Sequence, residues 1–251
     1  MLLTIDVGNT TTGFGVFEGK TLIYTFRIST INRTDDEITI LLYDLFKING
    51  LDFNIEGAII SSVVPYLTQK IVNAIEKIFK VKTKEVGAGI KTGVKILYDN
   101  PKEVGADRIV NALAAYEKCL GAAIVVDFGT ATTFDCVSEK CEYLGGVIAP
   151  GVNISMECLR EHTAKLPKIS LEKPLRIIGK NTIESMRSGI YFGYIEMVEG
   201  IIERLKLEMQ NPSVIFTGGD AQFFIKEIKH VDYFEPNLTF YGLWSIYHKN
   251  V

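Results

Sequence analysis

The chain lacks the features that mark membrane proteins, secreted proteins and nucleic-acid-binding proteins. No apolar run approaches the ~20 residues that a bilayer-spanning helix needs. The N-terminal apolar stretch is broken by Asp6 and has no basic leader, which argues against a signal peptide. Lysine and arginine number 27 against 30 aspartates and glutamates, and they are dispersed, so no basic face for nucleic acid is indicated. We therefore expect a cytoplasmic protein with no membrane or nucleic-acid partner.

Signatures of zinc sites and of the commonest nucleotide loops are also missing. The four cysteines form no C-x-x-C pair and the three histidines are scattered, so no zinc site is indicated. We expect free thiols in a reducing compartment at Cys119, Cys136, Cys141 and Cys158. The chain contains no G-x-x-x-x-G-K-[ST] loop, and no G-x-G-x-x-G follows a strand. Neither a P-loop nor a dinucleotide site therefore has support.

What the chain does have is enough apolar sequence for a substantial core. It is 251 residues long, 47% of them hydrophobic, with a mean hydropathy of +0.18. These values are typical of an ordered globular protein with one large or two small domains.

An internal repeat is the most informative feature. The stretch Ile5 to Thr12 (IDVGNTTT) is echoed by the stretch Val126 to Thr133 (VDFGTATT), almost half a chain later. Each copy follows an apolar run that is typical of a buried strand, and each opens a strand, turn, strand, turn, strand pattern. A repeat of this length indicates two duplicated halves facing each other, although a short turn used twice by chance is the simpler alternative.

The repeated segments carry groups suited to phosphate and metal. Each places a carboxylate, Asp6 or Asp127, at a strand end, followed by a glycine and several threonine hydroxyls. A carboxylate can bind a metal ion, while backbone N–H groups and hydroxyls can bind phosphate oxygens. Two such loops across a cleft could hold a nucleoside triphosphate from both sides.

The rest of the sequence alternates helix and strand. A capping box at 34–37 predicts a helix to about Lys47, and Pro65 suits the first turn of a second helix. The segment 91–101 has turn residues and no helical period, so we expect an extended loop there. The longest helix is expected from Thr182 to about Met209, with three glycines that would permit close approach of another element.

A second group of functional candidates lies just before the second half. Tyr98-Asp99-Asn100-Pro101 precedes Gly105-Ala106-Asp107-Arg108, which places a carboxylate beside a guanidinium at a helix N-terminal region. Arginine can bind a substrate carboxylate through two hydrogen bonds, and an aspartate can take a proton from a substrate hydroxyl. A surface helix with a favourable N-terminal aspartate explains the same residues equally well.

A third candidate is a glycine turn near the C-terminal end. Thr217-Gly218-Gly219 follows a buried strand, and its glycines permit close approach to a ligand. Taken alone, an ordinary strand-to-helix turn is the better interpretation.

Together these motifs resemble the type III pantothenate kinase family. The resemblance runs in order over essentially the whole chain, through the segments 6–10, 98–101, 105–108, 127–133, 145–151, 179–182 and 217–219. It implies an α/β fold of two duplicated ribonuclease-H-like (actin-like) halves, each a mixed sheet flanked by helices, with a nucleotide cleft between them. We place the halves at 1–120 and 121–251, with the last helix able to pack back on the first half.

The resemblance implies an ATP-dependent phosphorylation of pantothenate, with Mg²⁺, a K⁺ or NH₄⁺ requirement and a homodimer. Asp107 matches the general base, Asp127 the monovalent-cation ligand, and Asp6 a group near Mg²⁺ that binds it directly or through water. The implied ATP-binding residues are Asp6, Val7, Gly8, Asn9, Thr10, Thr11, Thr12, Gly13, Thr130, Thr132, Gly218 and Gly219. The implied pantothenate-binding residues are Tyr98, Gly105, Ala106, Asp107, Arg108 and Thr182, the last reaching the partner subunit's site.

Two positions depart from the family pattern. Thr11 stands where many relatives have asparagine, and Asp220 stands where an apolar residue often follows Thr-Gly-Gly. A carboxylate beside a nucleotide would repel phosphate, so we expect Asp220 to point to solvent. The alternatives to a pantothenate kinase are a kinase of another small hydroxy acid or sugar, and a non-catalytic actin-like nucleotide-dependent regulator. A base beside an anion anchor favours the enzyme.

Overall fold

The computed structural model describes residues 1–251, which form two compact units. The first unit contains Met1–Val94, Asp99–Ala114 and Leu238–Val251, and the second contains Lys95–Tyr98 and Ala115–Asn237. The units do not have the bounds of the expected halves 1–120 and 121–251, because residues 95–98 and 115–120 belong to the second unit. Residues 238–251 belong to the first unit, as the expectation allowed for the last helix. None of the helices combines the length and the apolar character that crossing a bilayer requires.

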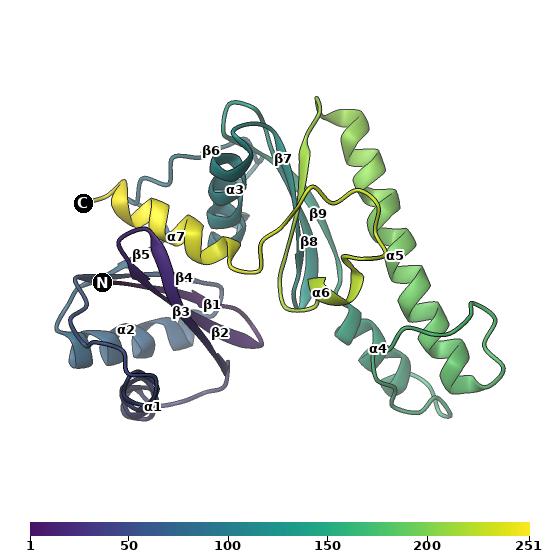
Figure 1. Ribbon diagram of the computed structural model, residues 1–251, viewed down its shortest axis with the longest axis horizontal. Coiled ribbons are helices and arrows are strands. Elements are labelled where there is room, and N and C mark those ends of the chain that lie inside the picture. The colour runs from purple at the N-terminus through teal and green to yellow at the C-terminus, as the bar shows by residue number, and fades with distance from the viewer. The chain divides into compact units, whose positions relative to one another are not determined.

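The first unit is built on a five-stranded sheet in the order β3-β2-β1-β4-β5 (Figure 1). Its strands are β1 (Leu2–Val7), β2 (Thr11–Glu18), β3 (Thr21–Ser29), β4 (Gly57–Ser62) and β5 (Thr83–Glu85). Its helices are α1 (Asp35–Ile48), α2 (Pro65–Phe79), α7 (Leu238–His248) and the first part of α3 (Ala106–Cys119), which follows a 3₁₀ turn at Pro101–Glu103.

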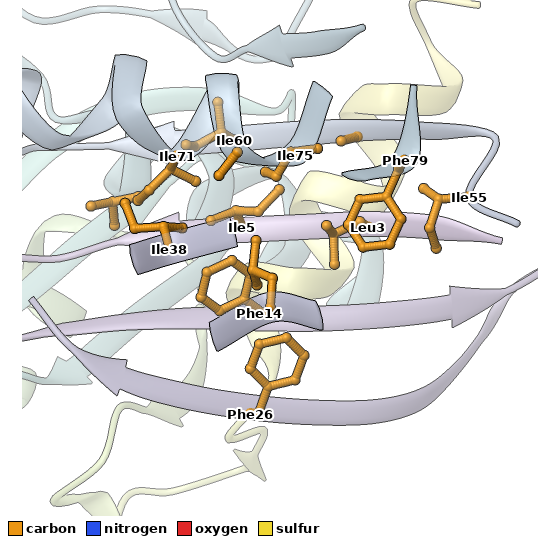
Figure 2. Packing of buried hydrophobic residues seen from close by; sticks show 14 of the residues in the cluster. Leu3, Ile5, Phe14, Phe26, Ile38, Ile55, Ile60, Ile71, Ile75 and Phe79 are labelled. Carbon is orange, nitrogen blue, oxygen red and sulfur yellow. The ribbon is translucent and has the colours of Figure 1, made fainter. Parts of the chain in front are cut away.

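Two faces of this sheet are covered by different helices. Alternate strand residues, among them Leu3, Ile5 and Phe14, pack against α1 and α2 in one core (Figure 2). The opposite face, with Leu2 and Phe17, packs against α7. Because a sheet with two apolar faces needs cover on both, the C-terminal helix completes the first unit.

The second unit has a six-stranded sheet in the order β11-β10-β7-β8-β9-β6. Its strands are β6 (Lys95–Ile96), β7 (Ala123–Phe128), β8 (Ala131–Val137), β9 (Glu142–Pro150), β10 (Ser213–Thr217) and β11 (Tyr233–Phe234). Its helices are α4 (Val152–Glu161), α5 (Thr182–Glu208) and α6 (Ala221–Phe224). Apolar residues of β7, β8 and β10 form one core with the buried face of α5.

The two sheets share one topology. In each, three antiparallel strands are followed by two strands parallel to the first, and β6 is the only addition. Each also carries a register shift at one position of its second strand, between Val16 and Phe17 and between Cys136 and Val137. This shared irregularity supports the duplication that the internal repeat predicts.

The repeats differ by one residue in the turn. Val7 pairs with Thr12 and encloses residues 8–11, whereas Phe128 pairs with Thr132 and encloses residues 129–131. The two acidic segments therefore match only up to the glycine, and the threonines after it are offset by one position. An ungapped comparison of the sequences hides this offset.

Most expected elements are present, with two corrections. The capping box at Thr34 and Glu37 opens α1, and Pro65 begins α2. The segment 91–101, expected to be an extended loop throughout, contains the short strand β6. Gly189, Gly193 and Gly200 of α5 have no neighbouring atom where a Cβ would lie. No other element of this chain therefore packs closely against them, contrary to the expectation.

Candidate functional site

The carboxylate of Asp6 is anchored by the strand beside it. Parallel pairing of β1 with β4 sets Asp6 opposite Ser61, and Ser61 Oγ donates a hydrogen bond of 2.7 Å to Asp6 Oδ1. The second unit repeats the arrangement, because β7 and β10 set Asp127 opposite Thr217. Each unit thus pairs a strand-end aspartate in register with a hydroxyl residue.

Burial makes Asp6 an unusually weak acid. Loss of water raises the pKa of Asp6 from 3.8 to about 7. The hydrogen bond from Ser61 and the charge of Arg27 lower this pKa, whereas the charge of Asp107 raises it. The structure therefore brings Asp6 and Asp107, which are far apart in the sequence, close enough for their charges to interact.

Asp107 lies in the first turn of α3. The backbone N–H of Arg108 donates to Asp107 Oδ1 at 2.9 Å. A Cβ at Gly105 would come within 2.4 Å of that same oxygen, so any larger residue there would displace the Asp107 carboxylate from its present position. Burial raises the pKa of Asp107, and the Arg108 N–H and guanidinium lower it. A carboxyl with a raised pKa is a stronger base once ionised.

The turn after Asp6 is held in place by hydrogen bonds within the turn and to Thr30. Gly8 N–H donates to Thr11 carbonyl oxygen at 3.1 Å, and Thr30 N–H donates to Thr10 carbonyl oxygen at 2.9 Å. The hydroxyls of Thr12 and Thr30 are 2.9 Å apart. Residues 9–11 are exposed while Thr12 is buried. The turn is therefore fixed by its neighbours and presents its tip to solvent.

The corresponding turn in the second unit is packed more tightly. Gly129 N–H donates to Ala131 carbonyl oxygen at 3.2 Å, and a Cβ at Gly151 would lie 2.3 Å from the Thr130 carbonyl oxygen. Thr130 is exposed, whereas Thr132 is buried and its hydroxyl is hydrogen-bonded to that of Tyr194. Burial raises the pKa of Tyr194 to about 12, so this hydroxyl stays protonated.

The glycine turn at 217–219 lies against the same part of the second unit. Gly218 has a φ of +91°, and a Cβ there would come within 2.5 Å of both Asp127 Oδ1 and Phe128 N. Gly219 is exposed, with open space beside it. The two glycines thus let the backbone approach Asp127 and leave room over the turn.

The expectation that Asp220 points to solvent needs correction. Its Oδ2 accepts a hydrogen bond of 2.7 Å from Asn153 Nδ2 at the start of α4. Its backbone N–H donates to Phe128 carbonyl oxygen at 3.2 Å. Partial burial raises the pKa of Asp220. The exposed amide of Asn153 gives this partly buried carboxylate a hydrogen-bond partner at the protein surface, which residue type alone did not indicate.

Tyr98 and Thr182 lie in different parts of the second unit. The ring of Tyr98, next to β6, lies 6.2 Å from the ring of Tyr143. Thr182 begins α5 and lines a groove of about 770 Å³ together with Leu159, Leu166 and Met186. Tyr98 and Thr182, both expected to contact the substrate, therefore have different neighbours within the second unit.

Several supporting residues were missed by sequence reasoning. Ser61, Thr30, Tyr194 and Asn153 each contact a candidate residue or its turn. Ser61 could have been found, because a buried apolar run that ends in Ser-Ser leaves a hydroxyl at a strand end. The others lie in separate elements, and no spacing in the sequence links them to the site.

The side chains suit a magnesium ion that is carried by phosphate. No group of three or more His, Cys, Asp or Glu could enclose a metal ion. Mg²⁺ in phosphate-transferring proteins is usually bound by one or two carboxylates, with waters and phosphate oxygens completing its octahedron. The Asp6 carboxylate, close to the turn at 8–11, fits that pattern.

Comparison with solved structures defines the fold class. The chain superposes over 99% of its length on 98% of a Baf family protein from Campylobacter jejuni, with a TM-score of 0.61 and 20% identity. It covers 99% of a ROK hexokinase from Thermus thermophilus with a TM-score of 0.51 and 12% identity. These likenesses, with the repeated sheets, define an actin-like α/β fold of two duplicated ribonuclease-H-like halves.

Sequence comparison identifies the family within that class. A family model for type III pantothenate kinases matches residues 2–204. The chain is 49% identical over 253 residues to a type III pantothenate kinase from Myxococcus xanthus, covering 100% of this chain and 99% of the relative. A type III pantothenate kinase from Halalkalibacterium halodurans is 48% identical over the full length of both chains. The chain therefore belongs to the type III pantothenate kinase family.

The buried carboxylate of Asp6 predicts a pH-dependent stability. Because its pKa is raised to about 7, the folded protein holds this proton more tightly than the unfolded chain does. The free energy of unfolding should therefore fall as pH rises from about 4 to 7. Asp6→Asn removes that loss. Without Mg²⁺ or nucleotide, its melting temperature should exceed the parent's by about 3 °C or more at pH 8, and by less at pH 5.

The exposed Asp44 provides a matched control for this measurement. Asp44→Asn should leave the melting temperature close to the parent's at both pH values. A stabilisation by Asp6→Asn that is the same at pH 5 and pH 8 would show that the Asp6 carboxyl has an ordinary pKa.

Proposed function

We propose that this protein transfers the γ-phosphoryl group of ATP to the primary hydroxyl of pantothenate, in the cytoplasm, as the first step towards coenzyme A. Membership of the type III pantothenate kinase family supports this activity. The observation that carries the mechanism is the position of Asp107, which is largely buried in the first turn of α3 and interacts electrostatically with Asp6.

Asp107 acts as the general base. As the substrate oxygen forms a bond to the γ-phosphorus, the bond from that phosphorus to the leaving oxygen of ADP breaks, and the hydroxyl proton passes to Asp107. The Arg108 N–H fixes the orientation of the Asp107 carboxylate. The Arg108 guanidinium binds the substrate carboxylate, and Tyr98, Gly105, Ala106 and Thr182 complete the proposed substrate contacts.

The two turns bind ATP. In the first unit, residues Asp6 to Gly13 offer backbone N–H groups and hydroxyls at an exposed tip. In the second unit, Thr130 offers an exposed hydroxyl and Thr132 supports it from a buried position. The turn of Gly218 and Gly219, which has open space beside Gly219, would lie under the adenosine end. Mg²⁺, held near Asp6, would offset the phosphate charge that otherwise repels the buried carboxylates.

Removing the proton acceptor tests the mechanism. Asp107→Asn keeps the shape and polarity of the side chain but cannot accept the proton, so kcat should fall by at least ~10²-fold. Binding of ATP should be largely retained. The measurement is a coupled assay of ADP release with pantothenate and with a panel of other hydroxy acids and sugars, using Asp44→Asn as the control.

The same assay separates the proposed function from its alternatives. The parent protein should consume ATP with pantothenate and little without it. Preference for another hydroxy compound would identify a different kinase, and ATP hydrolysis that pantothenate neither stimulates nor diverts would identify a regulator. Turnover by Asp107→Asn within a few-fold of the parent would exclude Asp107 as the base.

Asp127 is proposed to bind a monovalent cation, K⁺ or NH₄⁺. Its Oδ1 lies beside the position of a Gly218 Cβ, in the turn that carries Thr130. A large cation held by such oxygens can offset phosphate repulsion, whereas an aspartate that only caps the turn would need no ion.

The cation requirement can be measured directly. Activity in sodium-only buffer should be low and should recover with potassium or ammonium, because only the larger ions fit an oxygen cage of this kind. Asp127→Ala should lose the response while its circular dichroism spectrum is unchanged. Equal rates of the parent in sodium and potassium would reduce Asp127 to a turn residue.

The protein is further proposed to be a homodimer. Leu175, Ile177 and Ile178 precede α5 and are largely exposed, and the groove beside Thr182 has apolar walls. The glycines of α5 have open space beside them. Apolar groups gathered in this way are typical of a protein–protein interface, and a second copy would bring Thr182 towards the partner subunit's site.

Light scattering should give about twice the 28.0 kDa mass of one chain. Leu175→Asp with Ile178→Asp should shift the mass towards the monomer and lower activity, because each change places a charge in the interface. Leu207→Asp alters an equally exposed leucine near the end of α5 and should leave the mass unchanged. A monomeric parent with full activity would refute the proposal.

A further inference from the structure

The second unit contains a buried carboxyl group, that of Asp135, which takes no part in the proposed phosphoryl transfer. Asp135 of β8 is fully buried. Its Oδ1 accepts a hydrogen bond of 2.8 Å from the hydroxyl of Tyr143, and its Oδ2 accepts one of 3.0 Å from Thr133 Oγ1. A buried charge is costly unless it is well hydrogen-bonded. Two hydroxyls directed at one carboxylate therefore fix all three side chains in one geometry.

Tyr143 in turn holds the segment that carries Tyr98. β6 is only two residues long, and Ile96 pairs with Tyr143 in register. The N–H of Leu97 donates to the Tyr143 carbonyl oxygen at 2.9 Å. The ring of Tyr143 is fully buried, and the ring of Tyr98 lies 6.2 Å from it at 51°.

A glycine of the same strand as Tyr143 also lies beside the Tyr98 ring. Gly145 has a φ of +119°, and a Cβ there would lie 3.5 Å from Cδ2 and Cε2 of Tyr98. Tyr98 itself is only partly buried. A short edge strand has few backbone hydrogen bonds, so the orientation of this ring depends on Tyr143 and Gly145 more than on β6 itself.

We propose that Asp135 and Tyr143 are positioning residues for Tyr98, and that they set the affinity for the small hydroxy acid that Tyr98 contacts. This inference rests on the proposed function, in which Tyr98 binds pantothenate. Asp135 orients the Tyr143 hydroxyl, the Tyr143 ring and carbonyl orient the Tyr98 segment, and the Tyr98 hydroxyl meets the substrate. None of these residues takes part in the transfer of the phosphoryl group.

The test begins with Tyr143→Phe, which keeps the ring and removes only the hydroxyl. KM for pantothenate should rise roughly three- to ten-fold, the scale expected for one lost buried hydrogen bond. KM for ATP and kcat should stay within about two-fold, because the turns and Asp107 are untouched. Asp135→Asn, which keeps the volume and an acceptor oxygen, should change the same KM in the same direction, and it serves where Tyr143→Phe folds poorly.

A double-mutant cycle separates positioning from a general loss of stability. If Tyr143 acts through Tyr98, then Tyr143→Phe or Asp135→Asn should have no further effect on KM in a Tyr98→Phe background. Tyr24→Phe is the matched control, because it also removes a hydrogen-bonded tyrosine hydroxyl, the one that donates to Asn49 Oδ1 at 2.5 Å in the first unit. It should lower the melting temperature and leave KM unchanged.

Two results would overturn the inference. One is an unchanged KM for pantothenate in both Tyr143→Phe and Asp135→Asn. The other is an effect on KM that persists in full in the Tyr98→Phe background. A parent protein that does not phosphorylate pantothenate at all would instead refute the proposed function, so the two failures are distinguishable.

Discussion

The parallel pairing of β1 with β4, and of β7 with β10, is the constraint on which the candidate site depends. It aligns Asp6 with Ser61 and Asp127 with Thr217. Because parallel strands end at the same edge of a sheet, this pairing also brings the turn after each aspartate next to the segment after the fourth strand. In the second unit that segment is the Gly218 turn, which packs directly against Asp127. A one-residue shift of either pair would turn these side chains to the opposite face of the sheet.

The first unit contains two carboxyl groups, those of Asp6 and Asp107, whose ionised forms a bound cation would stabilise. Burial raises the pKa values of Asp6 and Asp107, and the charge of Asp107 raises that of Asp6 further. Two carboxylates in this setting resist ionising together, and a divalent ion favours the state in which both are charged. In the proposed reaction, a magnesium ion carried by the nucleotide would favour the ionised, basic form of Asp107. The hydrogen bond from Ser61 and the charge of Arg27 oppose the effect of burial and lower the pKa of Asp6.

Sequence reasoning found the fold and the polar turns because both rest on local patterns. The repeat of an acidic strand end predicts two similar sheets, and the capping box at Thr34 and the proline at position 65 mark helix starts that the structure confirms. The strand β6 was missed because two residues carry no periodicity. Asn153 and Tyr194 were missed because their partners, Asp220 and Thr132, lie on other elements. Contacts that depend on register and packing leave no spacing in a single sequence.

The position of α7 has a consequence for how the chain folds during synthesis. This helix covers one face of the first sheet, and the indole of Trp244 hydrogen-bonds to the carbonyl oxygen of Gly19, 225 residues earlier in the sequence. The strands of the first unit are synthesised early, but the face that carries Leu2 and Phe17 stays uncovered until α7 has left the ribosome. A sheet with one exposed apolar face is prone to aggregate until that face is covered. The N-terminal sheet can therefore bury its second face only after α7 has been synthesised, and not when the first half of the chain is complete.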